Sequence, residues 1–129
     1  MPKSKIILPL QSNNLEEVLG LLFTCFPEAK QDDSFIPGWT FLLKDTDPNQ
    51  VAFGLFIDKE LVGVISYTNG EIGNLCIKES FRKHGNGKKL FRKMVTFCNE
   101  KGLNCFIRST NDTILKLASK LKIEVHNAI

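Results

Sequence analysis

The chain has 129 residues, of which 43% are hydrophobic and 24% are charged, and its formal net charge is +3. A chain of this length can bury about two-thirds of its surface, so we expect one globular domain over residues 1–129 that needs no metal or disulfide for stability. No apolar stretch reaches the roughly 18 residues of a membrane-spanning helix, which excludes that class of protein.

The cysteines are Cys25, Cys76, Cys98 and Cys105, and none forms a CxxC pair or has a histidine at the spacing of a zinc site. The pattern therefore predicts no metal site. Free cysteines are usually buried, so we expect Cys76, Cys98 and Cys105 to be reduced thiols in apolar surroundings. The apolar run Ile6–Leu10 is too short for a secretory signal and contains a proline, which predicts a cytoplasmic protein, with the nucleus left open.

One segment of the chain is acidic, although the whole chain is basic. Residues 26–50 carry five acidic and two basic side chains, a formal charge of −3. The five acids are Glu28, Asp32, Asp33, Asp45 and Asp47. The positive remainder suits an anionic ligand, whereas the acids suit either simple solvation at the surface or the attraction of a cation.

The N-terminal third is expected to contain one strand and one long helix. The strand covers Lys5–Leu10, and apolar residues at helical spacing predict a helix from about 14 to 26, which Pro27 ends. Turn-forming residues fill 28–49, around a short helix or turn near Trp39–Leu43.

The middle of the chain has the period of β structure. Val51–Ile57, Leu61–Thr68 and Glu71–Lys78 are predicted strands, and Asn69-Gly70 between the last two is a strong turn signal. We expect these three strands to form an antiparallel meander.

The last third alternates between helix and strand. Residues 88–101 and 111–121 each place apolar side chains on one helical face, and Leu103–Arg108 and Ile123–Val125 are predicted strands. Because a helix joins the strand that begins at Glu71 to the strand that ends at Arg108, those two strands should be parallel. The order predicts a mixed α/β domain.

A basic loop that contains two glycines leads into the helix near Lys88. Its sequence is Arg82-Lys83-His84-Gly85-Asn86-Gly87-Lys88. The first amides of a helix have no partner within it and carry a partial positive charge, and glycines let the backbone approach a ligand closely. These features predict a phosphate or diphosphate site, although a simple basic surface loop would share them.

Two common phosphate loops do not fit this sequence. A Walker A loop requires glycine at position 82 and serine or threonine at position 89, where the chain has Arg82 and Lys89. A dinucleotide-binding loop that starts at Gly85 requires glycine or alanine at position 90, where Leu90 stands.

The loop instead resembles the Arg/Gln-x-x-Gly-x-Gly/Ala signature of the GNAT acetyltransferase superfamily, with Arg82, Gly85 and Gly87 at the defining positions. The preceding Glu71–Ile77 resembles the family's fourth strand, and residues 107–121 resemble the strand and helix that follow. The likeness covers nearly the whole chain. It implies a GNAT fold, in which a mostly antiparallel sheet has helices on both faces and a parallel pair of strands splays apart at the cofactor site.

The resemblance implies that the chain binds acetyl-CoA. Leu75–Ile77 matches the strand residues whose backbone groups pair with the pantetheine arm, and residues 82–88 match the stretch that binds the diphosphate. Asn111 matches an asparagine at a helix start that contacts the cofactor. Gly73 within a strand is compatible with a bulge where the strands separate.

The resemblance also implies acetyl transfer to a primary amine by direct attack in a ternary complex. Some relatives use a glutamate early in the fourth strand as general base, and Glu71 matches that position, where a merely solvated residue is the alternative. Many relatives use a tyrosine of the last helix as general acid, where this chain has Ala118. Tyr67, Cys76, Ser119 or a water could replace that acid, and Cys76 could also carry the acetyl group.

The missing tyrosine leaves a second function open, that of a regulatory module that binds acetyl-CoA with little or no turnover. The acceptor is an unidentified amine, either a small amine, a polyamine or a protein amine, and the acidic segment suits a cationic one. The basic stretch 78–93 lacks the interleaved exposed aromatic residues of a nucleic-acid site. The short C-terminus leaves an edge strand, which favours a homodimer.

Overall fold

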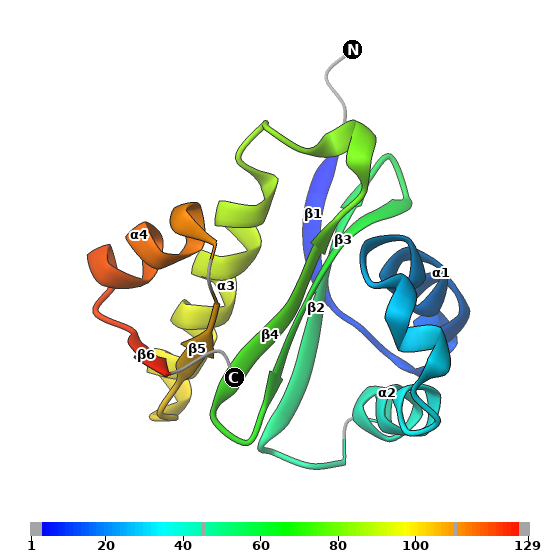
Figure 1. The fold of residues 1–129 in the computed structure, drawn as a ribbon, viewed down its shortest axis with the longest axis horizontal. Helices are drawn as coiled ribbons and strands as arrows, with labels where there is room; N and C mark the ends of the chain where they lie inside the picture. Colours follow the sequence, from blue (N-terminus) through cyan, green and yellow to red (C-terminus); the bar gives the residue numbers. More distant parts are fainter. Residues whose placement is uncertain (1–3, 45, 110, 127–129) are drawn as a thin grey trace.

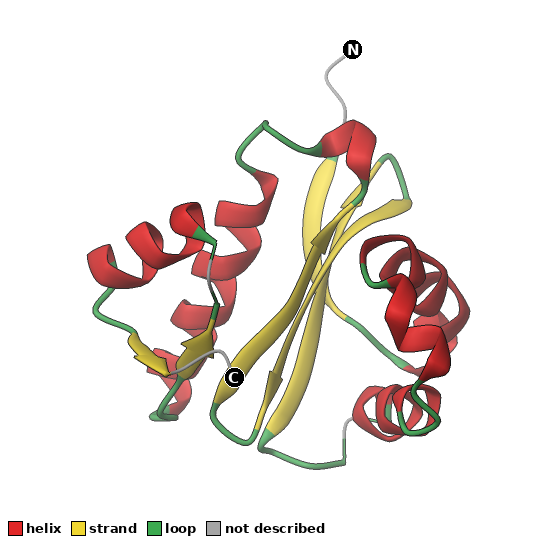
Figure 2. Ribbon diagram, in the orientation of Figure 1, coloured by secondary structure: helices red, strands yellow, loops and turns green. Residues whose placement is uncertain are grey.

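The structure is a computed structural model that describes residues 4–44, 46–109 and 111–126. These residues form a six-stranded sheet with helices on both faces (Figures 1 and 2). The strands are β1 (Lys5–Pro9), β2 (Gln50–Ile57), β3 (Glu60–Thr68), β4 (Glu71–Ile77), β5 (Phe106–Arg108) and β6 (Glu124–His126). The helices are α1 (Leu15–Cys25), α2 (Phe35–Leu43), α3 (Asn86–Lys101) and α4 (Asp112–Lys120), with short 3-10 turns η1 (Ser12–Asn14), η2 (Pro27–Gln31) and η3 (Glu79–Phe81). Asp45 of the acidic segment and Thr110 before α4 lie outside the described residues.

The strands lie in the sheet in the order in which they occur in the chain. Each neighbouring pair from β1 through β4 is antiparallel, which confirms the predicted meander of β2, β3 and β4. β4 pairs in parallel with β5, which confirms the predicted crossover, and β5 pairs in parallel with β6. Helix α2 begins at Phe35, earlier than predicted, and accommodates Pro37 in its first turn, where a missing N–H breaks no helical hydrogen bond. Helix α3 begins at Asn86 rather than Lys88.

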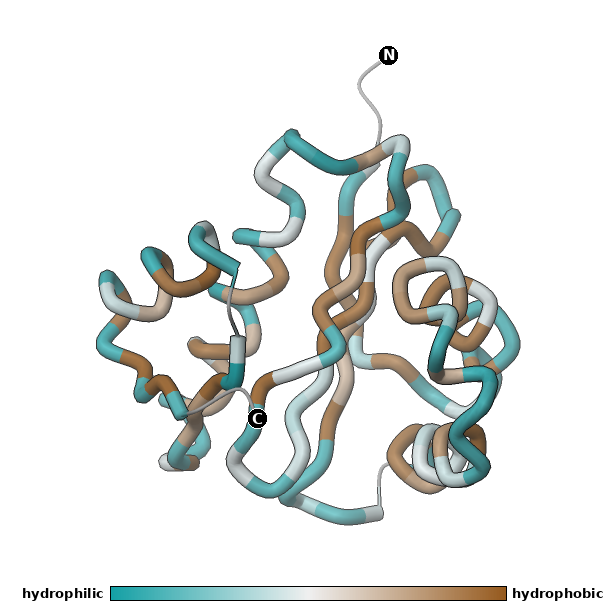
Figure 3. The backbone as a smooth tube through the Cα atoms, viewed as in Figure 1, coloured by the Kyte–Doolittle hydropathy of each residue, from teal (hydrophilic) through white to brown (hydrophobic). Residues whose placement is uncertain are grey.

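Two hydrophobic clusters hold the layers together, one on each face of the sheet. Helices α3 and α4 pack on one face, where Val62 and Ile65 of β3 lie, and α1 and α2 cover the other, where Leu61 and Val64 lie. Figure 3 shows hydrophobic residues along the strands and on neighbouring helices. Since both faces are covered, β3 is buried along almost its whole length.

Strand β4 contains a β-bulge that follows Gly73 directly, where the glycine suggested one. Gly73 pairs with Ser66 and Cys76 pairs with Val64, so two residues of β4, Asn74 and Leu75, lie opposite one residue of β3. Asn74 has a positive φ of 51°. The extra residue shifts the alternation of side chains, because the two faces of a strand follow a period of two.

As a result of this shift, Cys76 faces the opposite side of the sheet from Ile72. Ile72, Leu75 and Ile77 contact the cluster under α3, whereas Cys76 lies in the cluster under α1 and is 2% exposed. There it forms a disulfide with Cys25, the last residue of α1. The expectation that Cys76 is a reduced thiol is therefore wrong.

The other two cysteines are free, as expected. Cys98 is buried and Cys105 is partly buried. Burial raises the pKa of the Cys98 thiol to about 12, and burial also raises the pKa of Cys105. Neither is therefore a thiolate at neutral pH.

The sheet has an edge strand at each end. β1 pairs only with β2, and β6 pairs only with β5, among the strands of the described ranges. Val125 on β6 is 48% exposed, in agreement with an open C-terminal edge. Within the same ranges, no helix combines the length and the apolar character needed to cross a bilayer.

Gly63 of β3 packs against Leu90 of α3, and this contact gives a stability prediction. A Cβ at Gly63 would lie 2.8 Å from Ile77 Cδ1 and 2.8 Å from Leu90 Cδ1, whereas nothing lies within 4 Å of a Cβ at Gly20 on the exposed side of α1. We expect Gly63→Ala to lower the free energy of unfolding by about 1–2 kcal/mol. Gly20→Ala should raise it by roughly 0.5–1 kcal/mol.

Urea unfolding followed by circular dichroism measures both changes. A Gly63→Ala protein as stable as the Gly20→Ala protein would show that the packing of β3 on α3 is looser than described.

Candidate functional site

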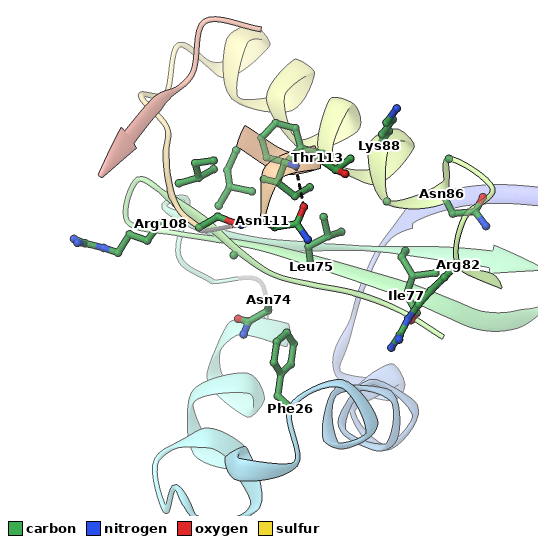
Figure 4. Close-up of a pocket in the computed structure, with 18 of the residues that line it drawn as sticks. Phe26, Asn74, Leu75, Ile77, Arg82, Asn86, Lys88, Arg108, Asn111 and Thr113 are labelled. Carbon is green, nitrogen blue, oxygen red and sulfur yellow. Dashed lines mark hydrogen bonds between the residues drawn. The ribbon is translucent and has the colours of Figure 1, made fainter. Parts of the chain in front are cut away.

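The main cavity of the described structure lies where β4 and β5 separate. These strands pair only at Glu71 with Phe106 and at Ile72 with Ile107, and the bulge follows immediately on β4. Beyond this pairing, a cavity of about 650 Å³ opens between them. Its walls are the second half of β4, the start of α3 and the turn between β5 and α4, and Figure 4 shows the side chains that line it.

The first turn of α3 forms one wall of the cavity. Gly85 precedes the helix with a left-handed φ of 78°, and its carbonyl accepts the first helical hydrogen bond, from the Lys89 N–H at 3.1 Å. The amides of Asn86, Gly87 and Lys88 therefore have no carbonyl four residues back within the helix. A Cβ at Gly87 would lie 3.8 Å from Ile77 Cγ1, an ordinary van der Waals contact, so the helix start lies directly against β4.

The side chain of Asn86 stabilises the loop between η3 and α3. It is 2% exposed, and its side-chain Nδ2 donates to the carbonyl of Phe81 at 2.9 Å. Its Oδ1 accepts from Lys5 Nζ at 3.3 Å. The side chain thus closes the loop between η3 and α3, and the backbone of the same residue remains at the cavity wall.

The lining of the cavity is positively charged. Its charged residues are Arg82, Lys83, Lys88 and Arg108, and the described lining contains no carboxylate. Arg82 is held in place because its Nε donates to the carbonyl of Ile77 at 2.8 Å. Together with the unpaired amides of α3, Arg82, Lys83 and Lys88 make this part of the cavity suited to an anion with several negative charges.

The far end of the cavity has a different character. Figure 4 shows Phe26 and Asn74 together on the α1 side of the sheet, away from α3 and α4. Glu71 lies beside this region, because its Oε2 is 3.9 Å from the position of a Cβ at Gly73, which lines the cavity. Its Oε1 lies 3.5 Å from Nε of Arg108, and both side chains are partly exposed. The cavity therefore connects a cationic end with an end that has a carboxylate at its margin.

Most of the residues selected from the sequence do line this cavity. They are Leu75, Ile77, Arg82, Lys83, Gly85, Asn86, Gly87, Lys88 and Asn111. Asn111 is the N-cap of α4, where its Oδ1 accepts from the Ile114 N–H at 3.1 Å, and Figure 4 shows its amide beside Leu75.

Three of the selected residues lie elsewhere. His84 belongs to the loop but is not part of the cavity lining, and Cys76 faces α1 and is joined to Cys25. Tyr67 is 3% exposed in the core under α3, and its hydroxyl donates to the carbonyl of Asn104 at 2.8 Å. Burial, with Cys98 nearby, raises the pKa of Tyr67. The Cys76 sulfur and the Tyr67 hydroxyl are thus held away from the cavity by their partners.

The structure adds cavity residues that the sequence analysis did not select. Phe26, Asn74, Arg108, Ser109 and Thr113 all line the cavity. Ser109 and Thr113 flank the Asn111 cap, so their positions beside a predicted helix start were a usable signal. Phe26 has no such signal, because its role depends on how the end of α1 lies against β4.

Comparison with known proteins points to one family. The sequence model of the family described as the acetyltransferase (GNAT) family matches residues 15–121. No curated protein matches the chain.

Solved structures share the fold at low sequence identity. The aminoglycoside N-acetyltransferase AAC(6')-Iy in complex with CoA has a TM-score of 0.73 at 21% identity, covering 96% of this chain and 90% of that one. A GCN5-related N-acetyltransferase from Ralstonia eutropha JMP134 has a TM-score of 0.72 at 18% identity, covering 92% and 91%. The PaiA N-acetyltransferase from Thermoplasma acidophilum, in complex with coenzyme A, has a TM-score of 0.68 at 17% identity, covering 91% and 87%.

Proposed function

This chain belongs to the GNAT acetyltransferase family, and we propose that it transfers the acetyl group of acetyl-CoA to a primary amine. The observation that carries the proposal is the cavity between β4 and β5, which joins a cationic wall at the start of α3 to a margin with the carboxylate of Glu71. An acyl donor that carries a diphosphate requires the cationic end, and an amine acceptor requires the end with the carboxylate. Structural neighbours crystallised with CoA and with aminoglycosides support the same assignment.

The residues at the start of α3 fit the diphosphate of acetyl-CoA. The first-turn amides of Asn86, Gly87 and Lys88 would bind its oxygens, and Arg82 and Lys83 supply positive charge beside them. The bound cofactor supplies an acetyl thioester. Because Asn74 and Leu75 form a bulge, backbone groups of β4 near the cavity are released from the ladder with β3 and could hydrogen-bond the pantetheine arm.

The acceptor is proposed to enter from the α1 side, past Phe26. An alkylammonium group has a pKa of about 10, so the amine must lose a proton before it attacks a thioester. Glu71 is the carboxylate at this margin, and Arg108 holds it there through their ion pair. Glu71 thus accepts the amine proton, directly or through one water, and direct attack in a ternary complex follows.

The departing thiolate lacks an obvious proton donor, which favours a second candidate function. The position of the expected tyrosine is Ala118, fully buried in the core, and the described cavity lining contains no tyrosine. The chain would then bind acetyl-CoA as a regulatory module without turnover. Release of free CoA with spermidine, sisomicin and a lysine-containing peptide decides between the two, because tight acetyl-CoA binding with no release on any amine would favour the module.

Gly87→Glu tests the binding of acetyl-CoA at the start of α3. A side chain at Gly87 would extend toward Leu75 and Ile77 across the cavity, and its carboxylate would repel the diphosphate. We expect the affinity for acetyl-CoA to fall by roughly 100-fold or more, a loss of about 3 kcal/mol, measured by calorimetry. The matched control is Gly20→Glu, which places the same charge on the exposed side of α1 and should bind normally. Unchanged affinity in Gly87→Glu would refute the site.

Glu71→Gln tests the general base. Loss of a positioned base costs about 10²–10⁴ in rate, so we expect kcat to fall within this range while the calorimetric affinity for acetyl-CoA stays the same. Glu100→Gln, an exposed change at the end of α3, is the control. A kcat of Glu71→Gln equal to that of the control would remove Glu71 from the mechanism.

Substitution of two acidic residues that follow Phe26 in the chain, Asp32 and Asp33, tests whether the acceptor is cationic. Asp32 and Asp33 lie just after η2, and hydrogen bonds from the Ser34 hydroxyl and backbone N–H lower the pKa of Asp32, which keeps it ionised. We expect the double variant Asp32→Asn and Asp33→Asn to raise KM more for spermidine than for a singly charged amine, by about 2–5-fold at low salt. Equal KM changes for both amines would mean that these acids are only solvated.

A further inference from the structure

The disulfide between Cys25 and Cys76 joins the end of α1 to β4, next to cavity residues on both sides. Cys25 is the last residue of α1 and Cys76 belongs to β4, and their Cα atoms are 6.1 Å apart. Phe26, which lines the cavity, follows Cys25 directly, and its N–H still donates to the Leu22 carbonyl at 2.7 Å. Any movement of the end of α1 therefore carries Phe26 with it.

On the β4 side, the cross-link lies between two cavity residues. Leu75 and Ile77, the neighbours of Cys76, both line the cavity, while the Cys76 side chain points to α1. The side chain of Arg82 connects the loop before α3 to β4 and to Cys25. Its Nε donates to the Ile77 carbonyl at 2.8 Å, and its Nη2 lies 3.7 Å from Cys25 Sγ.

The two sulfurs differ in access. Cys25 is partly exposed, whereas Cys76 is 2% exposed, so an external thiol reaches Cys25 first. The free cysteines do not compete for this exchange, because burial raises the pKa of both the Cys98 and the Cys105 thiols.

We propose that Cys25–Cys76 is a thiol–disulfide exchange site for a dithiol reductant, and that its oxidation state controls amine binding at the Phe26 end of the cavity. The part that concerns amine binding rests on the proposed acetyltransferase function. The exchange itself and its effect on the end of α1 do not.

The exchange balances as a two-electron transfer from the dithiol. A thiolate of the reductant attacks Cys25 Sγ, the bond between the two cysteine sulfurs breaks, and the Cys76 thiolate leaves and takes up a proton. The second thiolate of the reductant then attacks the reductant's sulfur in the mixed disulfide, and Cys25 leaves as a thiolate beside the Arg82 guanidinium and takes up the second proton. The products are two protein thiols and the cyclic disulfide of the reductant.

Reduction should loosen the acceptor end and leave the diphosphate end in place. The loop at the start of α3 is held by Asn86, whose partners are Phe81 and Lys5, and Arg82 is held by the Ile77 carbonyl, so these hydrogen bonds do not require the disulfide. Phe26, in contrast, loses the only covalent tie between α1 and β4 in the described structure. The oxidised protein is therefore the form with the ordered acceptor end.

The experiment compares protein equilibrated with oxidised and with reduced dithiothreitol. Alkylation in denaturant, read by mass spectrometry, should label two cysteines in the oxidised form and four in the reduced form. Hydrogen exchange should then be faster on reduction at the amides of residues 22–26 and unchanged at 90–98. Spermidine, sisomicin and the lysine peptide are tested as acceptors. For an amine that is acetylated, reduction should raise KM by roughly fivefold or more, while the affinity for acetyl-CoA stays within about twofold of that of the oxidised protein.

Two variants separate this site from general effects of the reductant. Cys25→Ser should behave as the reduced form and ignore dithiothreitol, and Cys105→Ser should respond as the parent protein does. Four labels in the oxidised form, or equal exchange at 22–26 in both forms, would overturn the proposal. Different hydrogen exchange in the two forms but equal KM for the amine would overturn the proposed control of amine binding. Absence of turnover on every amine would count against the acetyltransferase function, and the alkylation and hydrogen-exchange data would still decide whether the disulfide is an exchange site.

Discussion

The extra residue in β4 is the constraint on which the site depends. A strand of strict period two would place Ile72 and Cys76 on one face and Leu75 and Ile77 on the other. Because Asn74 and Leu75 together oppose one residue of β3, the alternation changes at this point. Leu75 and Ile77 then face α3 and line the cavity, and Cys76 turns to α1. The same irregularity comes where β4 and β5 stop pairing, so one feature opens the cavity, supplies its apolar wall and places a cysteine behind it.

The cavity divides its chemistry between the two helical layers. On the α3 side, the helix start contributes amides, and Arg82, Lys83 and Lys88 add charge, which suits a ligand with several negative charges. On the α1 side, Phe26 provides an apolar wall and Glu71 a carboxylate at the margin. In the proposed reaction, separation of the two ends by the sheet keeps the carboxylate away from the diphosphate, whose binding it would weaken, and close to the amine, where a base is useful.

The disulfide adds a covalent connection between α1 and β4. The proposed diphosphate end is held by the hydrogen bonds of Asn86 to Phe81 and to Lys5. The proposed acceptor end is held by packing of α1 and by the bond from Cys25 to Cys76. The two ends thus depend on different interactions, so a change at the disulfide can alter one end without the other. Closure of a covalent loop also restricts the unfolded chain, so the same bond contributes to stability.

The sequence by itself determined the order of the elements, the meander, the parallel crossover and the loop before α3, because these depend on local period, turn residues and helix-start chemistry. It also identified most cavity residues on β4 and α3, and it placed Gly73 where a bulge could form. Tertiary structure decided which face of β4 each side chain occupies, since the register depends on pairing with β3. It therefore decided that Cys76 meets Cys25, that Tyr67 is held in the core, and that Phe26 reaches the cavity. These contacts join residues far apart in the chain, and no local pattern of apolar and polar residues records them.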